Sequence, residues 1–440
     1  VEDDVDDDAE DDIDNDVEDD AEDDIDNDMK DDADDDIDDD IDVSTQTIVG
    51  TTIAAANFEN LAQRASQELE SAIEQRTEAD NKKIFSDDWL ILNDPNDMDF
   101  LAANGYSIIS TRFLPSLNKD LIRVEAPATF KPDVEGEKLL LSLNSTQRAV
   151  DFNHIYTLSE QKSLADTQQL SPQKLITIES PIERQRVGVI DTQLESTHPA
   201  LRSVSITSKD FSENNPISIS SHGNSVVSIL VGNSDEYTGL LSNVDVYAAS
   251  VFFDDDTNGQ ITTTESLIQS LDWLISQDVK VINMSLAGPP NMVLSAAIDK
   301  YCEQGVIIVA AVGNSGPHSK PLFPAAYDCV IGVTAISENN LIYRRAVRGK
   351  QVDIASYGVN VRAAANNNSY SNVTGTSFAT PFVTAQLLSL LPTEPLNTVA
   401  QQQDVIDALI ALTVDLGEPG KDEIYGHGAL IKTIDSASEK

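Results

Sequence analysis

The sequence predicts an α/β protein whose main domain is a doubly wound parallel sheet, preceded by a small α+β domain and a disordered acidic tail. The main domain is predicted from residue 185 onward, because strand-like apolar runs alternate there with helical stretches. Continuous Val and Ile runs of this kind are typical of parallel strands that are covered on both faces. The five runs read RVGVI, VDVYAAS, VKVINMSL, VIIVAAVG and CVIGVTAI.

The small domain is predicted over residues 85–156, where strand-like and helical stretches follow one another in the order β-α-β-β-α-β, a ferredoxin-like arrangement. The expected strands are 89–93, 106–114, 120–126 and 148–154, and the expected helices are 96–104 and 134–143. A helical linker over residues 44–84 precedes this domain, and a polar linker over 157–184 follows it. Residues 185–440 then form the main domain.

The acidic tail, residues 1–43, contains three copies of a twelve-residue repeat, which read VDDDAEDDIDND, VEDDAEDDIDND and MKDDADDDIDDD. Its first 42 residues carry 28 Asp and Glu against a single lysine. Repulsion between like charges at this density predicts a solvated, disordered segment. The alternative is a weak, multivalent binding segment for calcium or other cations, because hard cations prefer carboxylate oxygens.

The charge and hydropathy of the chain exclude two classes of partner. The formal net charge is −48, from 76 acidic and 28 basic residues. Nucleic acid is therefore not an expected partner, since phosphate binding needs clustered Lys and Arg. No apolar run reaches the length of about 18 residues that a membrane-spanning helix needs, so no membrane span is expected.

Three polar residues stand where catalytic groups gather in a doubly wound sheet, at the carboxyl ends of strands and the starts of helices. Asp191 ends the run RVGVID, His222 begins the helical stretch HGNSVVSILVG, and Ser377 opens another in GTSFATPFV. A serine hydroxyl needs a base to become a nucleophile, and imidazole titrates near neutrality. A carboxylate fixes the imidazole tautomer and stabilises its charged form. The pattern therefore predicts a catalytic triad.

These motifs, in the order Asp, His, Ser, resemble the subtilisin family of serine proteases, the subtilases. The similarity runs from about residue 186 to 428 and includes VINMSLAGP, AAVGNSG and FPAAYDCVIGVTA. The chain departs from the family pattern at three positions that are not catalytic: Gln193, Asn224 and Phe378. The resemblance implies a secreted or cell-envelope endopeptidase that acts on protein or peptide substrates and needs no cofactor for its chemistry.

The resemblance also implies a role for individual residues. Asp191 would orient the base, His222 would act as base and acid, and Ser377 would attack the carbonyl. Asn314 would donate its side-chain amide to the oxyanion, together with the backbone N–H of Ser377. A stretch of backbone would pair with an extended substrate as an added strand. This stretch consists of Ser285, Leu286, Ala287 and Gly288.

The first specificity pocket, which receives the side chain before the scissile bond, is implied in the same way. Gly313 belongs to one wall, and Ala287 replaces a family glycine in the other. Leu322 stands where the family often has a glycine on the pocket floor. Both replacements add volume, and overfilling a packed site excludes large side chains. We therefore expect a preference for small or medium apolar residues, such as Ala or Val, before the scissile bond.

A β-α-β-β-α-β unit directly ahead of a subtilase domain resembles the propeptide of this family, a folding assistant and inhibitor. The resemblance thus implies that residues 85–156 act as an intramolecular inhibitor and that the chain is made as a zymogen. Maturation is then expected within residues 157–184. The alternative is a permanent accessory domain.

Residues 254–265 read DDDTNGQITTTE and match the ligand pattern of an EF-hand calcium loop. The expected ligands are Asp254, Asp256, Asn258, Gln260 and Glu265. A strand-like run, not a helix, precedes the loop, so an acidic surface turn is the alternative. A structural calcium ion is accordingly a candidate cofactor. A calcium site would also fit an alternative function, that of a calcium-responsive surface or interaction protein with a vestigial protease domain. The intact triad argues against this alternative.

The remaining histidines and the cysteines have simpler expectations. Three histidines match no motif and are expected to be structural or at the surface: His154, His198 and His427. His318 follows the loop that contains Asn314. For this histidine the alternative to a structural or surface position is a place in the lining of the active-site cleft. Cys302 and Cys329 precede two consecutive runs that are neighbouring strands in subtilases. They are expected to form either a disulfide or two buried thiols.

Overall fold

The computed structural model describes residues 84–93, 105–125, 149–158, 161–162 and 171–432, apart from 213–214, 218–219, 395 and 397. These residues all belong to one compact unit, Asn60–Lys440. The acidic repeats, most of the predicted helical linker and the two predicted helices of the small domain lie outside the described residues.

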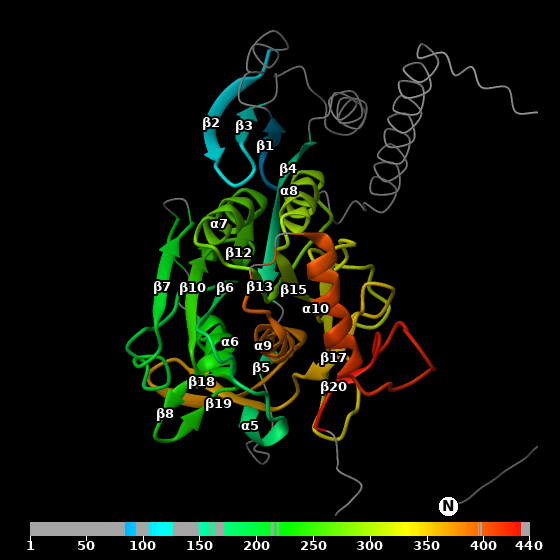
Figure 1. Ribbon diagram of the computed structural model, residues 1–440. Helices are drawn as coiled ribbons and strands as arrows, with labels where there is room; N and C mark the ends of the chain where they lie inside the picture. Colours follow the sequence, from blue (N-terminus) through cyan, green and yellow to red (C-terminus); the bar gives the residue numbers. More distant parts are fainter. Residues whose placement is uncertain are drawn as a thin grey trace, which may run out of the picture. The chain divides into compact units, whose positions relative to one another are not determined.

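An eight-stranded parallel sheet forms the centre of the large domain (Figure 1). Its order is β20-β17-β16-β15-β13-β6-β10-β7. The five predicted runs become β6 (Gln185–Asp191), β10 (Val244–Ser250), β13 (Val281–Met284), β15 (Ile307–Ala311) and β16 (Val330–Ile336). The other three strands are β7 (Ile206–Asp210), β17 (Ile354–Tyr357) and β20 (Ala429–Leu430). They were not predicted, because they are short or exposed and lack a long apolar run.

Side chains along the central strands alternate between two hydrophobic layers, as the doubly wound prediction requires. In β15, Ile307 and Val309 belong to one layer, and Ile308 and Ala310 belong to the other. The first layer contains α6 (His222–Val231), α9 (Thr380–Leu390) and α10 (Val399–Ala411). The second contains α7 (Thr264–Ser276) and α8 (Met292–Glu303). Among the described helices, none is long and apolar enough to cross a membrane.

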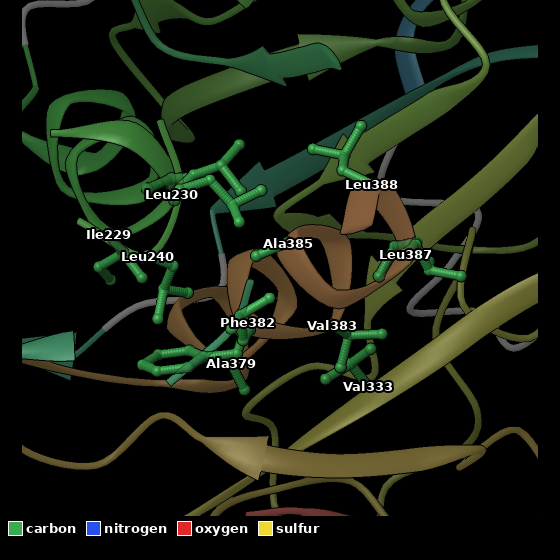
Figure 2. Packing of buried hydrophobic residues seen from close by; sticks show 14 of the residues in the cluster. Ile229, Leu230, Leu240, Val333, Ala379, Phe382, Val383, Ala385, Leu387 and Leu388 are labelled. Carbon is green, nitrogen blue, oxygen red and sulfur yellow. The ribbon is translucent and has the colours of Figure 1, made fainter. Parts of the chain in front are cut away.

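The helix α9 is buried over most of its length because it is enclosed by other elements. It contacts α6, α10 and the strands β13, β15, β16 and β17. Figure 2 shows Phe382, Val383 and Leu387 of α9 packed among Leu230 of α6 and Val333 of β16. This close packing fixes the helix that begins directly after the predicted nucleophile.

The small domain contains the four predicted strands in an antiparallel sheet. They are β1 (Ile84–Asn93), β2 (Ser107–Leu114), β3 (Lys119–Glu125) and β4 (Ala149–Leu158). The order β4-β1-β3-β2 places β3 between β1 and β2. This order is that of the predicted ferredoxin-like arrangement.

The strand β4 runs four residues further than predicted and continues into the large domain, where it can be followed past α8 in Figure 1. There it lies between β12 (Gly259–Thr263) and β14 (Leu286–Ala287), antiparallel to both. Thr157 pairs with Ile261 on one side and with Ala287 on the other. The small domain therefore contributes a strand to the large one.

The same strand caps both helices that lie beneath it. The Asp151 carboxylate accepts a hydrogen bond from the Met292 amide of α8 at 2.8 Å. The Asn153 side-chain oxygen accepts one from the Glu265 amide of α7 at 3.0 Å. The first N–H groups of a helix have no partner within the helix, and acceptors placed there are stabilising. The docked small domain thus satisfies donors that α7 and α8 cannot satisfy themselves.

A second anchor comes from the turn between β2 and β3. The Ser116 amide donates to the Asp272 carboxylate of α7 at 3.0 Å, and Gln304 after α8 donates to the Ser116 carbonyl oxygen at 3.0 Å. Tyr301 of α8 also donates to the Asp272 carboxylate, at 3.2 Å. Burial raises the pKa of the Asp272 carboxyl, although the hydrogen bonds from Ser116 and Tyr301 act in the opposite direction.

The predicted polar linker 157–184 is structured at both ends. β5 (Gln161–Lys162) adds to a sheet with β19 (Ser369–Thr374) and β18 (Val361–Ala365). Further along, the end of α5 (Pro172–Leu175) and the residues after it are buried in the large domain core. Leu175, Ile176 and Ile178 belong to the same layer as α6 and α9. The large domain therefore begins before residue 185.

A disulfide joins Cys302, at the end of α8, to Cys329, just before β16. The two Cα atoms are 6.4 Å apart. Of the two expectations for these cysteines, the structure has the disulfide.

Candidate active site

The predicted general base and its carboxylate partner form a buried pair. Asp191 is the last residue of β6, and His222 is the first residue of α6. The His222 Nδ1 lies 2.8 Å from one Asp191 carboxylate oxygen and 3.0 Å from the other. Both side chains are at most 2% exposed. A buried carboxylate in this position holds the proton on Nδ1, so that Nε2 is the basic nitrogen.

The start of α6 is fixed by the loop after β6. The Gly223 amide donates to the Thr192 hydroxyl at 2.9 Å, and the Thr192 amide donates to the Asp191 carboxylate at 2.7 Å. A Cβ atom at Gly223 would lie 2.8 Å from the Thr192 carbonyl oxygen. Only glycine therefore permits this close approach, which brings His222 to Asp191.

The predicted nucleophile, Ser377, lies in η1 (Thr376–Phe378), a single 3-10 turn directly before α9. Its hydroxyl donates to the Ser285 carbonyl oxygen at 3.1 Å. Its carbonyl oxygen accepts hydrogen bonds from the Ser285 and Thr380 hydroxyls, each at 2.9 Å. The His222 ring packs against the ring of Phe378, with centroids 5.2 Å apart. Since Phe378 follows Ser377 in the chain, the predicted base and the predicted nucleophile lie in the same corner of the molecule.

Asn314, the predicted oxyanion ligand, is held by the residue before Ser377. The Asn314 side-chain oxygen accepts hydrogen bonds from the amide and the hydroxyl of Thr376, each at 3.1 Å. The Gly313 amide donates to the same hydroxyl at 3.2 Å. The side-chain oxygen is thus engaged on Thr376, and Nδ2 is the donor end of Asn314. Thr376 was missed in the sequence, although it belongs to the GTS motif.

The predicted substrate-pairing segment, Ser285–Gly288, lies next to Ser377 and already has a strand on it. Its central residues form β14, which pairs with β4. Gly288 pairs with Phe323 through two backbone hydrogen bonds of 2.8 and 3.0 Å. The ring of Tyr156 in β4 covers Gly288, because a Cβ atom there would lie 2.3 Å from it. The chain's own small domain thus occupies the edge where an extended substrate is expected.

The three departures from the family pattern leave this geometry in place. Gln193 is exposed in the loop after β6. The Asn224 side chain is buried and accepts a hydrogen bond from the Glu195 amide at 2.8 Å, so that it braces the same loop. Phe378 is buried against His222.

The predicted calcium ligands are divided between two parts of the structure. Four of them lie in the hairpin of β11 (Phe253–Asp255) and β12: Asp254, Asp256, Asn258 and Gln260. The fifth, Glu265, is in the first turn of α7, and its carboxylate lies 3.5 Å from Arg123 of β3. In the part of the chain that the structure describes, no group of three or more His, Cys, Asp and Glu is placed to hold a metal ion. A calcium ion stays a prediction.

The hairpin turn has a different stabilising residue, Asp255. Its carboxylate accepts hydrogen bonds from the Thr257 amide at 3.0 Å and the Asn258 amide at 2.7 Å. These bonds lower the pKa of Asp255. An acidic residue that closes a turn in this way is consistent with the alternative reading of the motif as a surface turn.

The remaining histidines differ in burial. His154 is buried in β4, where its Nδ1 lies 2.8 Å from Nδ2 of Asn291. His198 is buried, and its Nε2 lies 2.9 Å from the Ser369 carbonyl oxygen. His427 is half-buried and His318 is exposed. The structural role expected for His154 and His198 agrees with their burial.

The parallel α/β fold and the arrangement of Asp191, His222, Asn314 and Ser377 are those expected for the family that the sequence motifs resemble. Comparison with known families agrees with this expectation. The chain belongs to the subtilase family, whose model matches residues 183–428. This confirms the family predicted from the sequence motifs. Subtilisin DY of Bacillus licheniformis is 30% identical over 251 residues, which are 56% of this chain and 88% of that protein.

Other relatives are matched over a smaller part of their length. Subtilisin E of Bacillus subtilis is 33% identical over 230 residues, 51% of this chain and 59% of that protein. Minor extracellular protease Epr of the same organism is 33% identical over 213 residues, 48% of this chain and 32% of that protein. The chain thus spans about one third of the length of protease Epr and about three fifths of that of subtilisin E.

Solved structures confirm the fold. Fervidolysin from Fervidobacterium pennivorans, a keratinolytic enzyme related to subtilisin, superposes with a TM-score of 0.62 at 18% identity, over 79% of this chain and 60% of that one. The epidermin leader peptide processing serine protease of Staphylococcus aureus gives a TM-score of 0.59 at 16% identity, over 78% and 97%. Both matches cover more of the chain than the subtilase domain alone.

Proposed function

We propose that this chain is a serine endopeptidase that hydrolyses peptide bonds in protein or peptide substrates through an acyl-enzyme. The buried Asp191–His222 pair beside Ser377 carries the proposal, because a carboxylate, an imidazole and a hydroxyl from distant parts of the sequence converge at one corner. The intact pair favours this function over that of an interaction protein with a vestigial protease domain. No cofactor is needed for the chemistry.

In the proposed mechanism, the Ser377 oxygen attacks the carbonyl carbon of the scissile bond while His222 takes the hydroxyl proton. Asp191 stabilises the imidazolium that forms. Nδ2 of Asn314 and the backbone N–H of Ser377 donate hydrogen bonds to the negatively charged carbonyl oxygen. Ser377 lies at the amino end of a helix, where the helix dipole also stabilises negative charge. His222 then gives its proton to the leaving amine, and water releases the acyl group by the same steps in reverse order.

We further propose that the chain is a zymogen whose small domain is its own inhibitor. The support is the position of β4, which pairs with β14 along the substrate edge and caps α7 and α8. Maturation would then separate this strand from the large domain. Since residues from Leu175 onward belong to the large domain core, cleavage is expected before residue 171.

Export from the cell is proposed with the zymogen, since an active endopeptidase is best kept inhibited until it has left the cell that makes it. The related protease Epr is described as extracellular. The net charge of −48 suits a protein that must remain dispersed in solution.

Replacing the nucleophile tests the function. Ser377→Ala should abolish both self-processing and casein hydrolysis, because loss of the nucleophile in subtilisin costs a factor of about 2 × 10⁶ in kcat. Ser203→Ala is the matched control, because Ser203 is exposed and bonds only to the Asn233 carbonyl oxygen among the contacts described. Casein hydrolysis retained by the Ser377→Ala variant would overturn the assignment.

A further inference from the structure

One loop of the large domain concentrates positive charge in an otherwise acidic chain. It lies between β16 and β17, and the sequence has no Asp or Glu there between Glu338 and Asp353. Residues 344–350, called the basic loop below, read RRAVRGK. Within these seven positions stand four of the 28 basic residues of the chain: Arg344, Arg345, Arg348 and Lys350.

The basic loop is anchored beside Asn314, the proposed oxyanion ligand. Val347 in the middle of the loop is buried, and its amide donates to the Gly313 carbonyl oxygen at 3.0 Å. The Arg345 carbonyl oxygen accepts a hydrogen bond from the Gly316 amide at 2.9 Å. These two bonds lie on either side of Asn314 in the sequence. The positive charges of the loop therefore have a fixed place next to the active site.

The guanidinium of Arg345 lies on the backbone of Asn314 and keeps most of its donors. Its Nε donates to the Asn314 carbonyl oxygen at 3.3 Å. Its two Nη groups make no hydrogen bond to the residues that the structure describes. Arg344 and Arg345 are both exposed. A planar guanidinium with free Nη groups binds a carboxylate through two parallel hydrogen bonds, so an acidic ligand suits this position.

Neighbouring carboxylates do not neutralise the basic loop. Elsewhere in the large domain, basic residues have acidic partners, as Arg184 has in Asp245 and Lys421 has in Asp353. None of the ion pairs between described residues involves the basic loop. A chain with a net charge of −48 thus keeps a local excess of positive charge beside its proposed nucleophile. Such charge attracts acidic groups.

The residues expected to bind the acyl side of a substrate lie on the other side of Asn314. They are the segment Ser285–Gly288 and the wall that contains Gly313. A Cβ atom on Gly313 would lie 2.5 Å from Cδ1 of Leu322 and 3.5 Å from the Ala287 Cβ. The part of the loop before Asn314 therefore faces the acyl side.

Arg345 lies beyond the position of the scissile carbonyl group. That carbonyl oxygen is expected at Nδ2 of Asn314. The Arg345 side chain bonds to the peptide unit that follows Asn314, and its backbone bonds to Gly316, further along in the same direction. The basic loop is therefore placed to meet the residues of a substrate that leave with the amine.

We propose that Arg344 and Arg345 recognise acidic side chains on the leaving-group side, so that the enzyme favours Asp or Glu in the first three positions after the scissile bond. The proposal rests on the peptidase function proposed above. The net charge of the whole chain leads to the opposite expectation, because an acidic enzyme attracts basic substrates. The local and the global charge therefore predict preferences of opposite sign.

Internally quenched peptides that differ at one position after the cleaved bond test the preference. Each position carries Asp, Asn or Lys in turn, and the enzyme is produced from the full chain. At one or more of the three positions, the Asp peptide should be cleaved roughly threefold to tenfold better than the Asn peptide, judged by kcat/KM, because exposed ion pairs contribute little each. The Lys peptide should be cleaved most slowly. A preference for Asn or Lys at all three positions would overturn the proposal.

Replacing the arginines identifies the residues responsible. Arg344→Gln and Arg345→Gln should each lower the ratio of Asp to Asn cleavage, and the double variant should bring it close to one. Arg345→Glu should favour the Lys peptide. Because the ratio is measured within each enzyme, a change in basal rate cancels. Arg202→Gln is the matched control, since Arg202 is exposed and lies outside the basic loop. An unchanged ratio in the double variant would contradict the proposal.

Two further measurements separate a specific contact from a general field. Raising the salt concentration from about 0.1 M to about 1 M shortens the screening length from about 10 Å to about 3 Å, which should bring the ratio closer to one. An Asp placed three positions before the bond should give a ratio that does not depend on Arg345. Equal dependence on Arg345 on both sides of the bond would contradict recognition of the leaving-group side.

Labelling with a fluorophosphonate, which reacts with an activated serine, distinguishes failure of this proposal from failure of the proposed function. An enzyme that is labelled on Ser377 and cleaves the peptides without preferring Asp keeps the peptidase function and loses only the proposed role of the basic loop. An enzyme that is neither labelled nor active on any peptide loses both.

Discussion

At the scale of single residues, the orientation of Asn314 shows how one neighbour sets a side chain for its proposed role in catalysis. The amide and the hydroxyl of Thr376 both bond to its side-chain oxygen. The amide nitrogen is therefore the end that can donate to the oxyanion. A donor fixed before the reaction needs no reorganisation when the negative charge develops, which makes it more effective than water.

Asn314→Ala should accordingly reduce kcat by roughly 10²–10³, the range known for the corresponding donor in subtilisin. We expect the fold to be retained, because the Asn314 side chain is only half-buried. Steady-state kinetics on a peptide anilide and a thermal melt measure the two effects. Asn314→Asp is the informative companion, since it keeps the acceptor for Thr376 and removes the donor. An unchanged kcat in both variants would mean that another group binds the oxyanion.

At the scale of elements, β4 connects two parts of the molecule through helix caps and strand pairing. Asp151 and Asn153 are two residues apart in β4, so their side chains lie on the same face of the strand. Each side chain reaches the amino end of a different helix. Glu265, in the first turn of α7, completes the contact with the small domain through Arg123 of β3. This interface accounts for the burial of a glutamate that the sequence motif assigns to calcium.

Glu265→Gln distinguishes these two roles of the glutamate. In the uncleaved Ser377→Ala chain it should lower the stability by roughly 1–2 kcal/mol, because the partly buried ion pair with Arg123 loses its negative charge. The change in melting temperature caused by EDTA should be the same with and without the substitution. Glu303→Gln, at an exposed glutamate paired with Lys300, is the control. A response to EDTA that disappears in Glu265→Gln would instead support the predicted calcium site.

At the scale of the whole molecule, the two hydrophobic layers of the parallel sheet carry the stability, and the disulfide adds to it. Cys302 and Cys329 are separated by 27 residues and join the second layer to the strand β16. A cross-link between residues this far apart restricts the unfolded chain more than the folded one.

Replacing both cysteines by serine should therefore cost about 3 kcal/mol. For a domain of this size, the melting temperature should fall by roughly 6–12 °C. Calorimetry in the Ser377→Ala background, where self-digestion is absent, gives the value. When both cysteines are kept, adding a reducing agent should lower the melting temperature by the same amount. A melting temperature that is equal in both forms would show that the cross-link does not constrain the unfolded state.

The sequence by itself determined the features that are local in the chain. The apolar runs of β6, β10, β13, β15 and β16 are continuous, so the parallel sheet could be predicted. The motifs around Asp191, His222 and Ser377 are short, so the family could be recognised. Each depends on backbone and side-chain preferences within about ten neighbouring residues.

Only the tertiary structure decided which distant groups meet. The insertion of β4 between β12 and β14, the pairing of Glu265 with Arg123 and the disulfide all join segments that local sequence does not relate. Leu322 is similar: its residue type was known, but its place against Gly313 depends on the path of the intervening loop. The physical reason is that local preferences fix the elements, whereas burial and hydrogen bonding across the folded chain choose their partners.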